Sequence, residues 1–198
     1  MARSRHSFCW SCIFFSGVQS RDAGVSESAI PPVSISADTV PKAKPGREDK
    51  ASAVITTGPI TDVVLIIEEV ARACGSSSLI PAVNKLGSMP LILGGTSEQK
   101  KRWLTPLAQG KGFSYCLSES EAGSDAASLR TKATKSGDKW IINGSKKWIS
   151  NAEVSDFYTV IAQTDPALGS KGITAFVVEK TDAGVSFGSP EKKMGFRG

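Results

Sequence analysis

The spacing of the apolar residues changes near residue 112, and this change constrains the fold more than any other feature of the chain. Upstream of it, apolar residues such as Val64, Ile67 and Ala71 recur every three or four positions, which predicts one buried face of a helix. Downstream of it, apolar and polar residues alternate, which is typical of strands with one buried face. The chain is therefore predicted to be an α+β protein in which helices precede a β-domain.

Three helices are predicted upstream of this change. The first spans 61–74, and Gly75 supplies its C-terminal stop. The second spans 78–93. The third begins at Thr96–Gln99, which has the sequence of a capping box, and continues through Leu107. Helices separated by such short connections can pack antiparallel.

Short strands separated by turn signals are predicted downstream. Asn143-Gly144 is a strong signal for a tight hairpin, because such turns need positive φ. Ser136-Gly137-Asp138 marks another turn. Short strands with frequent turns predict a small antiparallel barrel or sandwich. The predicted strands are 113–118, 128–135, 139–143, 146–150, 157–164, 172–179 and 184–188.

The first 60 residues differ in composition from the rest. Residues 1–21 contain no acid and three arginines around a short apolar stretch, which fits a weak targeting segment or a disordered extension. Residues 26–60 are rich in Ser, Pro, Ala, Lys and Thr and are predicted to be largely disordered. The predicted location is the cytoplasm, or the mitochondrial matrix if residues 1–21 are a transit peptide. The predicted domains are a disordered or targeting-like extension (1–60), a partial N-terminal helical domain (61–111) and a β-domain (112–198).

Composition is that of an ordinary globular protein and argues against several classes. Hydrophobic residues make up 40% and charged residues 22% of the chain. No segment approaches the roughly 20 apolar residues of a membrane span. The net charge of +5 suits phosphate-rich small molecules, and the lysines form no aromatic-interleaved stripe for nucleic acid. Cys9-Trp10-Ser11-Cys12 has no second pair and no histidine at zinc spacing, so no metal site is predicted.

Two segments carry the candidate binding site. Tyr115–Asp125 begins as a half-buried strand and ends in the small residues Ala122-Gly123-Ser124, which offer backbone N–H groups and little bulk. Lys146–Ala152 follows about twenty residues later and places Trp148 beside Ser150. Together the segments predict a site for a flat heterocycle that carries phosphates.

These segments resemble the middle β-domain of the acyl-CoA dehydrogenase family. The family's loop (Thr/Ser)-Glu-Pro-x-Ala-Gly-Ser-Asp stands here as Ser118-Glu119-Ser120-Glu121-Ala122-Gly123-Ser124-Asp125. Its Trp-Ile-Thr-Asn stands here as Trp148-Ile149-Ser150-Asn151, in which Ser150 keeps the hydroxyl. The resemblance runs from about Thr61 to Gly198. It implies the fold of the family's first two domains, a set of helices followed by a β-domain.

The resemblance also implies that the cofactor is FAD, held between the β-domain and a C-terminal helical domain. Ser118 and the loop backbone would contact the flavin and its ribityl–phosphate arm, and Trp148 would cover one face of the isoalloxazine. Ser150 would hydrogen-bond near the flavin N5, and Ser124 would also face the acyl-CoA substrate. The implied cofactor-binding residues are Tyr115, Cys116, Leu117, Ser118, Glu119, Ser120, Glu121, Ala122, Gly123, Ser124, Trp148, Ile149 and Ser150.

Several of these residues have plain structural alternatives. A tryptophan such as Trp148 is more often a core residue, Cys116 fits a small core position, and Asp125 is more simply a turn cap. Glu119 and Glu121 share one face of an extended run and could pass for a catalytic carboxylate pair. In the family, however, the base is a Glu of the C-terminal helical domain, so no catalytic residue is predicted in this chain.

The function implied by the resemblance is α,β-dehydrogenation of acyl-CoA thioesters. A carboxylate takes the α-proton while the β-hydrogen leaves as hydride to the flavin. The family passes electrons to electron-transfer flavoprotein and forms homotetramers. This chain is expected to be a truncated form that is inactive alone. Two alternatives stay open: a relative of acyl-CoA oxidases or nitroalkane oxidases, and a non-catalytic fragment without bound flavin.

Overall fold

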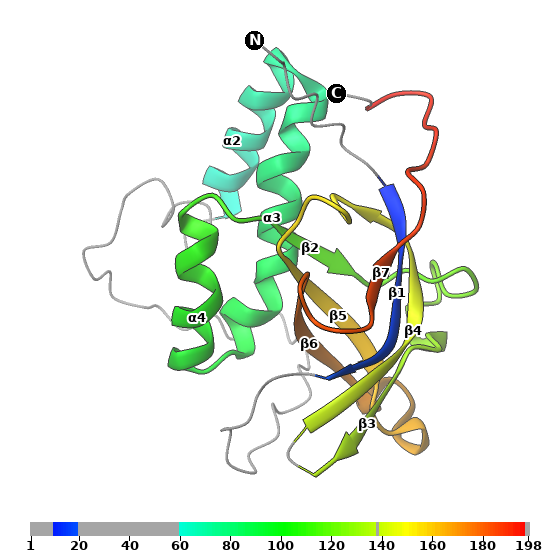
Figure 1. Cartoon of the computed structure of the whole chain (residues 1–198). Helices are drawn as coiled ribbons and strands as arrows, with labels where there is room; N and C mark the ends of the chain where they lie inside the picture. The colour runs from blue at the N-terminus through cyan, green and yellow to red at the C-terminus, as the bar shows by residue number, and fades with distance from the viewer. Residues whose placement is uncertain (1–9, 20–59, 138, 197–198) are drawn as a thin grey trace.

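The computed structural model describes residues 10–19, 60–137 and 139–196 (Figure 1). In these ranges three helices gather on one side of a curled sheet, and the chain reaches the helices before most of the strands. The helices are α2 (Ile60–Ala73), α3 (Gly75–Gly94) and α4 (Ser97–Ala108). The strands are β1 (Trp10–Gln19), β2 (Phe113–Cys116), β3 (Lys132–Ser136), β4 (Lys139–Ser150), β5 (Phe157–Gln163), β6 (Ile173–Glu179) and β7 (Val185–Phe187), with short 3₁₀ helices η1 (Ala126–Ser128) and η2 (Pro166–Gly172).

The sheet is mixed rather than antiparallel throughout. Its order is β2-β5-β3-β4-β1-β7. Strand β6 lies off this path and pairs with β5. The pairs β3–β4 and β5–β6 are antiparallel, whereas β2 runs parallel to β5, with Phe113 opposite Phe157. This parallel pair arises because the β3–β4 hairpin intervenes in the chain between β2 and β5. The α+β class and the order of helices before the β-domain are confirmed.

The helices form close to the positions that local signals predict. At the start of α4, Thr96 Oγ1 accepts a hydrogen bond from Gln99 N (3.2 Å), and Gln99 Oε1 accepts one from Thr96 N (2.9 Å). The predicted capping box is therefore confirmed. The second helix begins at Gly75, three residues before its predicted start, and Pro81 lies inside it. None of the helices in the described ranges has the length and apolar character needed to span a bilayer.

Helix α3 lies directly on the strand that leads into the candidate loop. Asn84 Oδ1 accepts a hydrogen bond from Phe113 N (2.8 Å), and Thr159 Oγ1 donates to Gly87 O (2.6 Å). A Cβ at Gly87 would lie 3.1 Å from backbone atoms of Phe113 and Ser114. Glycine thus permits the close approach of helix and strand, and this contact fixes the position of β2.

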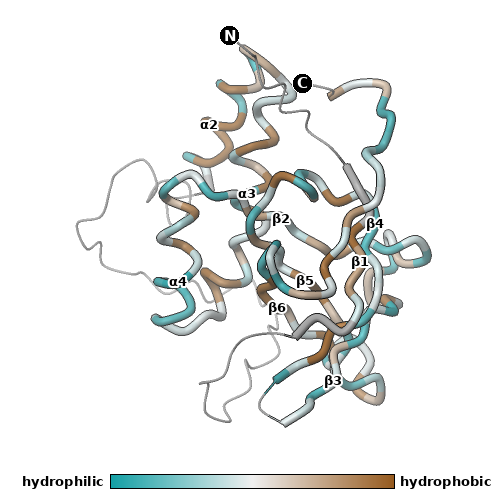
Figure 2. Tube along the Cα trace, in the orientation of Figure 1, coloured by the Kyte–Doolittle hydropathy of each residue, from teal (hydrophilic) through white to brown (hydrophobic). Residues whose placement is uncertain are grey.

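Two apolar clusters hold the layers together. Strand β5 is central, because all residues from Phe157 to Ala162 are buried. One cluster lies among the strands of the sheet, and the other joins α3 and α4 to the sheet through Leu91, Trp103 and Phe113. Figure 2 shows apolar stretches along α2 and α3, with polar stretches in the peripheral loops of the sheet. The core therefore supports both β2 and β4, which carry the candidate site.

The predicted hairpin at Asn143-Gly144 is wrong. These residues lie inside one continuous strand, β4, which pairs with β3 on one side and β1 on the other. Glycine is required there for another reason: a Cβ at Gly144 would lie 2.5 Å from Thr131 Oγ1, and its φ is 153°. The turn predicted at 136–138 falls between β3 and β4, where Ser136 pairs with Lys139; residue 138 itself lies outside the described residues.

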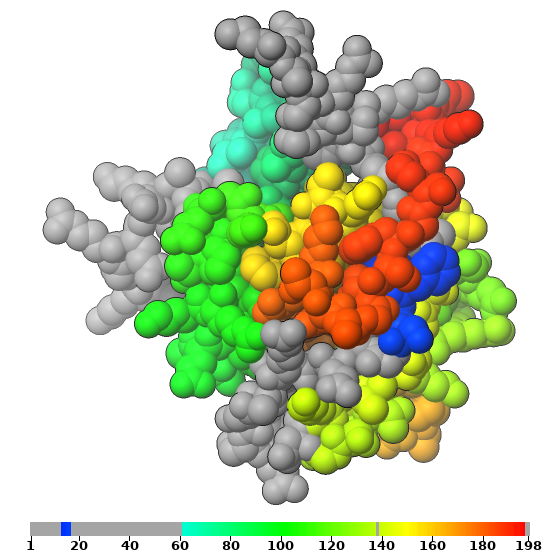
Figure 3. Space-filling model, in the orientation of Figure 1, coloured from blue at the N-terminus to red at the C-terminus, as the bar shows by residue number. Residues whose placement is uncertain are grey.

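The disordered alternative for residues 1–21 is wrong for residues 10–19, which form β1 between β4 and β7. Ile13 and Phe15 are buried in the sheet core, while Phe14 is 46% exposed on the other face. Figure 3 shows this part of β1 against the segment that contains β7. The burial of alternate apolar side chains explains why the segment forms a strand. The remaining predictions for this region fall on 1–9 and 20–59, which lie outside the described residues.

Candidate flavin-type binding site

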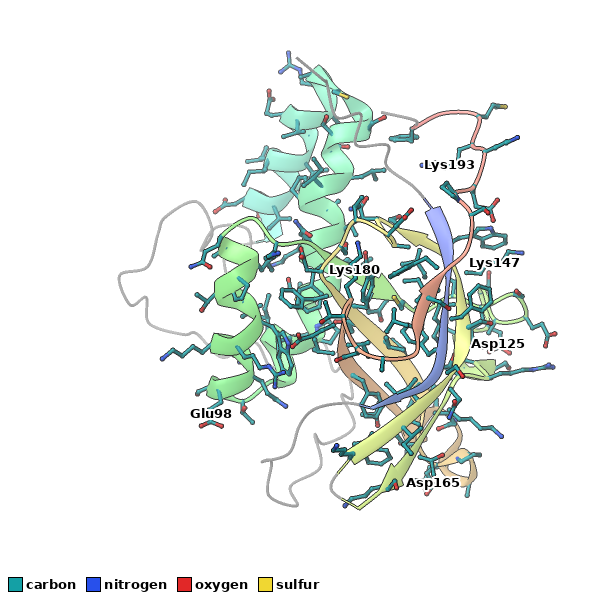
Figure 4. All side chains as sticks on the ribbon, in the orientation of Figure 1. Glu98, Asp125, Lys147, Asp165, Lys180 and Lys193 are labelled. Carbon is teal, nitrogen blue, oxygen red and sulfur yellow. The ribbon has the colours of Figure 1, made fainter. Side chains whose placement is uncertain are left out.

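The loop after β2 lies beside the end of β4, so the structure brings together the two segments that the sequence singles out. Lys147 N donates a hydrogen bond to Ser118 O (2.8 Å). Ser114 of β2 donates from its Oγ to the carbonyl oxygen of Ser150, the last residue of β4 (2.7 Å). Figure 4 shows Lys147 and Asp125 on the same side of the molecule, away from the helices. The two segments thus form one continuous surface.

A buried ion pair fixes this junction. The Lys146 side chain is fully buried, and its Nζ donates to Glu119 Oε1 (2.7 Å) and to Leu117 O (3.0 Å). The Glu119 carboxylate also accepts backbone hydrogen bonds from Arg130 N (2.6 Å) and Thr131 N (3.0 Å). Glu119 therefore joins the start of the 118–131 loop to its end, and Lys146 joins both to β4.

The pKa values of the pair follow from burial and from these hydrogen bonds. Burial alone would raise the pKa of Glu119, but the Lys146 ammonium and the backbone N–H groups outweigh it and hold that pKa below its ordinary value. Burial is the largest influence on Lys146 and lowers its pKa, although Glu119 opposes the shift. Glu119 is therefore a charged structural group. Glu121 is exposed and pairs instead with Arg130, so the two glutamates do not form a catalytic pair.

In the middle of the 118–131 loop, Ala122 is buried, whereas the next two residues, Gly123 and Ser124, face solvent. Glu119 N donates to Ala122 O (3.0 Å), and Ala122 is buried against Leu129 and Ile161. Gly123 and Ser124 are exposed, and a Cβ added to Gly123 would meet no atom within 4 Å. The loop therefore offers an open small-residue surface on a fixed base.

Trp148 projects outward from a bulge in β4. Ser11 of β1 pairs with Ile149, but Ile13 pairs with Lys146, so β4 has one extra residue at this point. Trp148 itself has φ 58°. The bulge lets Lys146 and Ile149 both point into the core, while the Trp148 side chain stays 51% exposed. This exposure excludes the alternative in which Trp148 is a core residue.

Family comparisons agree with this geometry. Residues 56–111 match the model of the acyl-CoA dehydrogenase N-terminal domain, and residues 114–198 match the model of the acyl-CoA dehydrogenase middle domain. The chain belongs to the acyl-CoA dehydrogenase family. The resemblance seen in the loop and in the Trp148 segment is thereby confirmed.

Similar proteins include named acyl-CoA dehydrogenases. A probable acyl-CoA dehydrogenase fadE25 of Mycobacterium leprae is 58% identical over 135 residues, which cover 68% of this chain and 35% of the relative. The solved butyryl-CoA dehydrogenase of Megasphaera elsdenii is 33% identical with a TM-score of 0.68, covering 75% of this chain and 40% of that one. An acyl-CoA dehydrogenase of Bacillus anthracis, solved with FAD, is 38% identical with a TM-score of 0.62, covering 69% and 23%. The chain thus spans about a third of the length of the curated relatives that it matches.

The predicted contact residues of this acyl-CoA dehydrogenase family member fall into two groups. One group has buried side chains, so these residues can offer a ligand only backbone atoms; it comprises Cys116, Glu119, Ala122 and Ile149. Burial also raises the pKa of the Cys116 thiol, as fits a core cysteine. The second group is partly or largely exposed and can offer side chains; it comprises Tyr115, Leu117, Ser118, Ser120, Glu121, Ser124, Trp148 and Ser150. Gly123 is also exposed and offers its backbone. Asp125 precedes η1 and accepts a hydrogen bond from the Ser128 hydroxyl, as expected of a turn residue.

Two residues of the site escaped the sequence prediction. Lys146 has the same strand parity as the buried Ile142, but the hairpin predicted at Asn143-Gly144 placed the two residues in different strands and hid this signal. Asn151 follows the strand with φ 60°, a conformation that asparagine tolerates. It is 7% exposed, and its Oδ1 has no hydrogen-bond partner among the described residues. A buried acceptor of this kind calls for a donor.

Proposed function

We propose that loop 118–125 and Trp148 bind FAD, and that this chain contributes the flavin-binding part of an acyl-CoA dehydrogenase. The observation that carries the proposal is the outward position of Trp148. A bulge and a positive φ hold a half-exposed indole next to Lys147, whose backbone N–H donates to Ser118 O at the start of the loop. Large exposed aromatic groups fixed next to such loops are suited to stacking on a planar ring.

The chemistry of the surrounding residues fits a flavin dinucleotide. Gly123 and Ser124 present an open backbone and a hydroxyl, which suit phosphate oxygens. Lys147 lies with its Nζ 5.1 Å from the centre of the Trp148 ring and adds positive charge at the same place. The buried Asn151 Oδ1 has no donor among the described residues and could accept a hydrogen bond from a ligand. The similar Bacillus anthracis protein was solved with FAD, which supports this choice of cofactor.

The proposed reaction is α,β-dehydrogenation of an acyl-CoA thioester. FAD, when bound, supplies the redox chemistry by accepting the hydride from Cβ. We assign to Trp148 the covering of one ring face, to the Ser150 hydroxyl a hydrogen bond near the ring N5, and to the Ser124 hydroxyl a position facing the acyl-CoA. The names of the fadE25 and butyryl-CoA dehydrogenase relatives support this substrate class.

The polypeptide 1–198 by itself is not expected to turn over acyl-CoA. Proton abstraction from Cα needs an accessible carboxylate within hydrogen-bond reach. Glu119 is buried in its ion pair, and Glu121 is paired with Arg130. We therefore propose that the base comes from outside this part of the site. Electron-transfer flavoprotein as acceptor, assembly as a homotetramer and a cytoplasmic location are further parts of the proposal.

A titration with FAD tests the cofactor site. Weak binding by the isolated chain is expected, because an open site leaves the ring in water. Trp148→Ala should weaken this binding by about 1–3 kcal/mol, or roughly 5- to 150-fold, if the indole stacks on the ring. Leu168→Ala is the matched control, because Leu168 is a similarly exposed apolar residue in η2. Equal FAD affinity of both variants and the wild type would refute the proposed site.

A further inference from the structure

Strand β1 occupies a gap between two strands of the family-matched sheet. It pairs with β4 from Trp10 opposite Ser150 to Gln19 opposite Ile141, and with β7 from Ile13 opposite Phe187 to Phe15 opposite Val185. Among the described strands, β7 pairs with β1 alone. Removal of β1 would therefore leave β7 without a neighbour and would leave one edge of β4 unpaired.

Burial shows that β1 is a built-in part of the core. Ile13 and Phe15 have 0% and 3% exposure and belong to the main cluster of the sheet. Val185 and Phe187 of β7 pack against the same cluster. The alternate residues Phe14 and Ser16 are exposed. The gap thus selects an extended segment with an apolar residue at every second position.

The strand that fills the gap comes from outside the family-matched part of the chain. The family models match from residue 56 onward, whereas β1 ends at Gln19. The roughly 40 residues between β1 and α2 have a fully extended length of about 130 Å. A connection of this length lets β1 reach either the sheet of its own chain or the sheet of a second molecule.

We propose that the gap between β4 and β7 is a strand-accepting site, and that Trp10–Gln19 of a second copy of this chain can occupy it. Two chains would then exchange their β1 strands, and each sheet would keep the pairings seen in the structure. Exchange of an identical element is a low-cost route to a dimer because no new contact surface is needed. A free peptide with the sequence of β1 would bind in the same way, through backbone pairing with β4 and β7 and burial of every second side chain. The proposal does not depend on flavin binding.

The first test uses peptide binding to the full chain. In Ile13→Asp the carboxylate cannot enter the apolar core, so the variant's own strand leaves the gap. A fluorescent Trp10–Gln19 peptide should then bind this variant saturably and bind the wild type at least about tenfold more weakly. Phe14→Asp is the matched control, because Phe14 is exposed on the opposite face, and it should bind no more peptide than the wild type. A peptide that carries Asp in place of Ile13 should not bind.

The second test keeps the proposal falsifiable if Ile13→Asp fails to fold. Wild-type chain is refolded under reducing conditions at about 1 µM and about 1 mM, a range that brackets typical effective concentrations of tethered segments. Light scattering should show a dimer fraction that grows with concentration and disappears when excess Trp10–Gln19 peptide is present during refolding. A strictly monomeric wild type at both concentrations, or a dimer indifferent to the peptide, would overturn the proposal.

Discussion

Removal of the buried Lys146 ammonium should strongly destabilise the fold. In Lys146→Met, the Glu119 carboxylate would keep only the backbone donors of Arg130 and Thr131, and Leu117 O would lose its hydrogen bond. Breaking a buried ion pair by removing one partner costs about 3–5 kcal/mol. Small domains have about 5–15 kcal/mol of stability in total, so the loss would be a large fraction of it.

Urea unfolding followed by tryptophan fluorescence would measure the loss. Arg130→Met is the matched control, because it removes the exposed Glu121–Arg130 pair on the same loop and leaves the Arg130 backbone N–H to Glu119 in place. Exposed pairs contribute about 0–1 kcal/mol, so this variant should unfold near the wild-type midpoint.

A double variant separates loss of the pair from loss of packing. Lys146→Met combined with Glu119→Leu removes both charges, so it should be less destabilised than the sum of the single substitutions. The reasoning would be refuted if Lys146→Met unfolded within about 1 kcal/mol of Arg130→Met. That result would mean that the junction is held by packing and not by the buried charges.

Further predictions concern pH, glycine and turnover. The pKa of Glu119 in the folded chain lies below its unfolded value, so its contribution to stability is complete above the unfolded pKa and is lost as pH falls through the folded pKa. The urea midpoint of the wild type should therefore fall at acid pH, and this fall should be smaller in Glu119→Gln. Gly144→Ala should cost at least about 2 kcal/mol because its Cβ would lie 2.5 Å from Thr131 Oγ1, whereas Gly123→Ala, with open space around it, should stay within about 0.5 kcal/mol by the same unfolding assay. Residues 1–198 with excess FAD should show no anaerobic bleaching of the flavin by butyryl-, isobutyryl- or octanoyl-CoA; bleaching at more than trace rates would reveal a base within this chain.

Features with a local cause were predictable from the sequence. The capping box at Thr96–Gln99 depends on residues three apart, and the structure contains both of its hydrogen bonds. The change of apolar period near residue 112 likewise separates α2, α3 and α4 from the strands β2 to β7. The two motif segments also meet as their family resemblance implies, through the Lys147–Ser118 hydrogen bond.

The rest depended on which segments become neighbours. Asn143-Gly144 has the local sequence of a tight turn, but both residues lie inside the continuous strand β4. Glycine at 144 instead leaves room for the neighbouring Thr131 side chain. Residues 10–19 have only a short apolar alternation, and a strand forms there because β4 and β7 offer pairing on both sides and a core for Ile13. Local composition carries no information about partners that lie more than a hundred residues away. Tertiary packing alone therefore decided the place of β1.

The same distinction applies to the site. The sequence determined which residue types are present: a loop of small residues, an aromatic group and several charges. Only the structure showed that a bulge turns Trp148 outward while Lys146 turns inward to Glu119. A bulge shifts the strand parity by one residue, and it arises from the pairing of β4 with β1. The side-chain directions that make this surface a candidate flavin site were thus set by strand pairing and not by the local sequence.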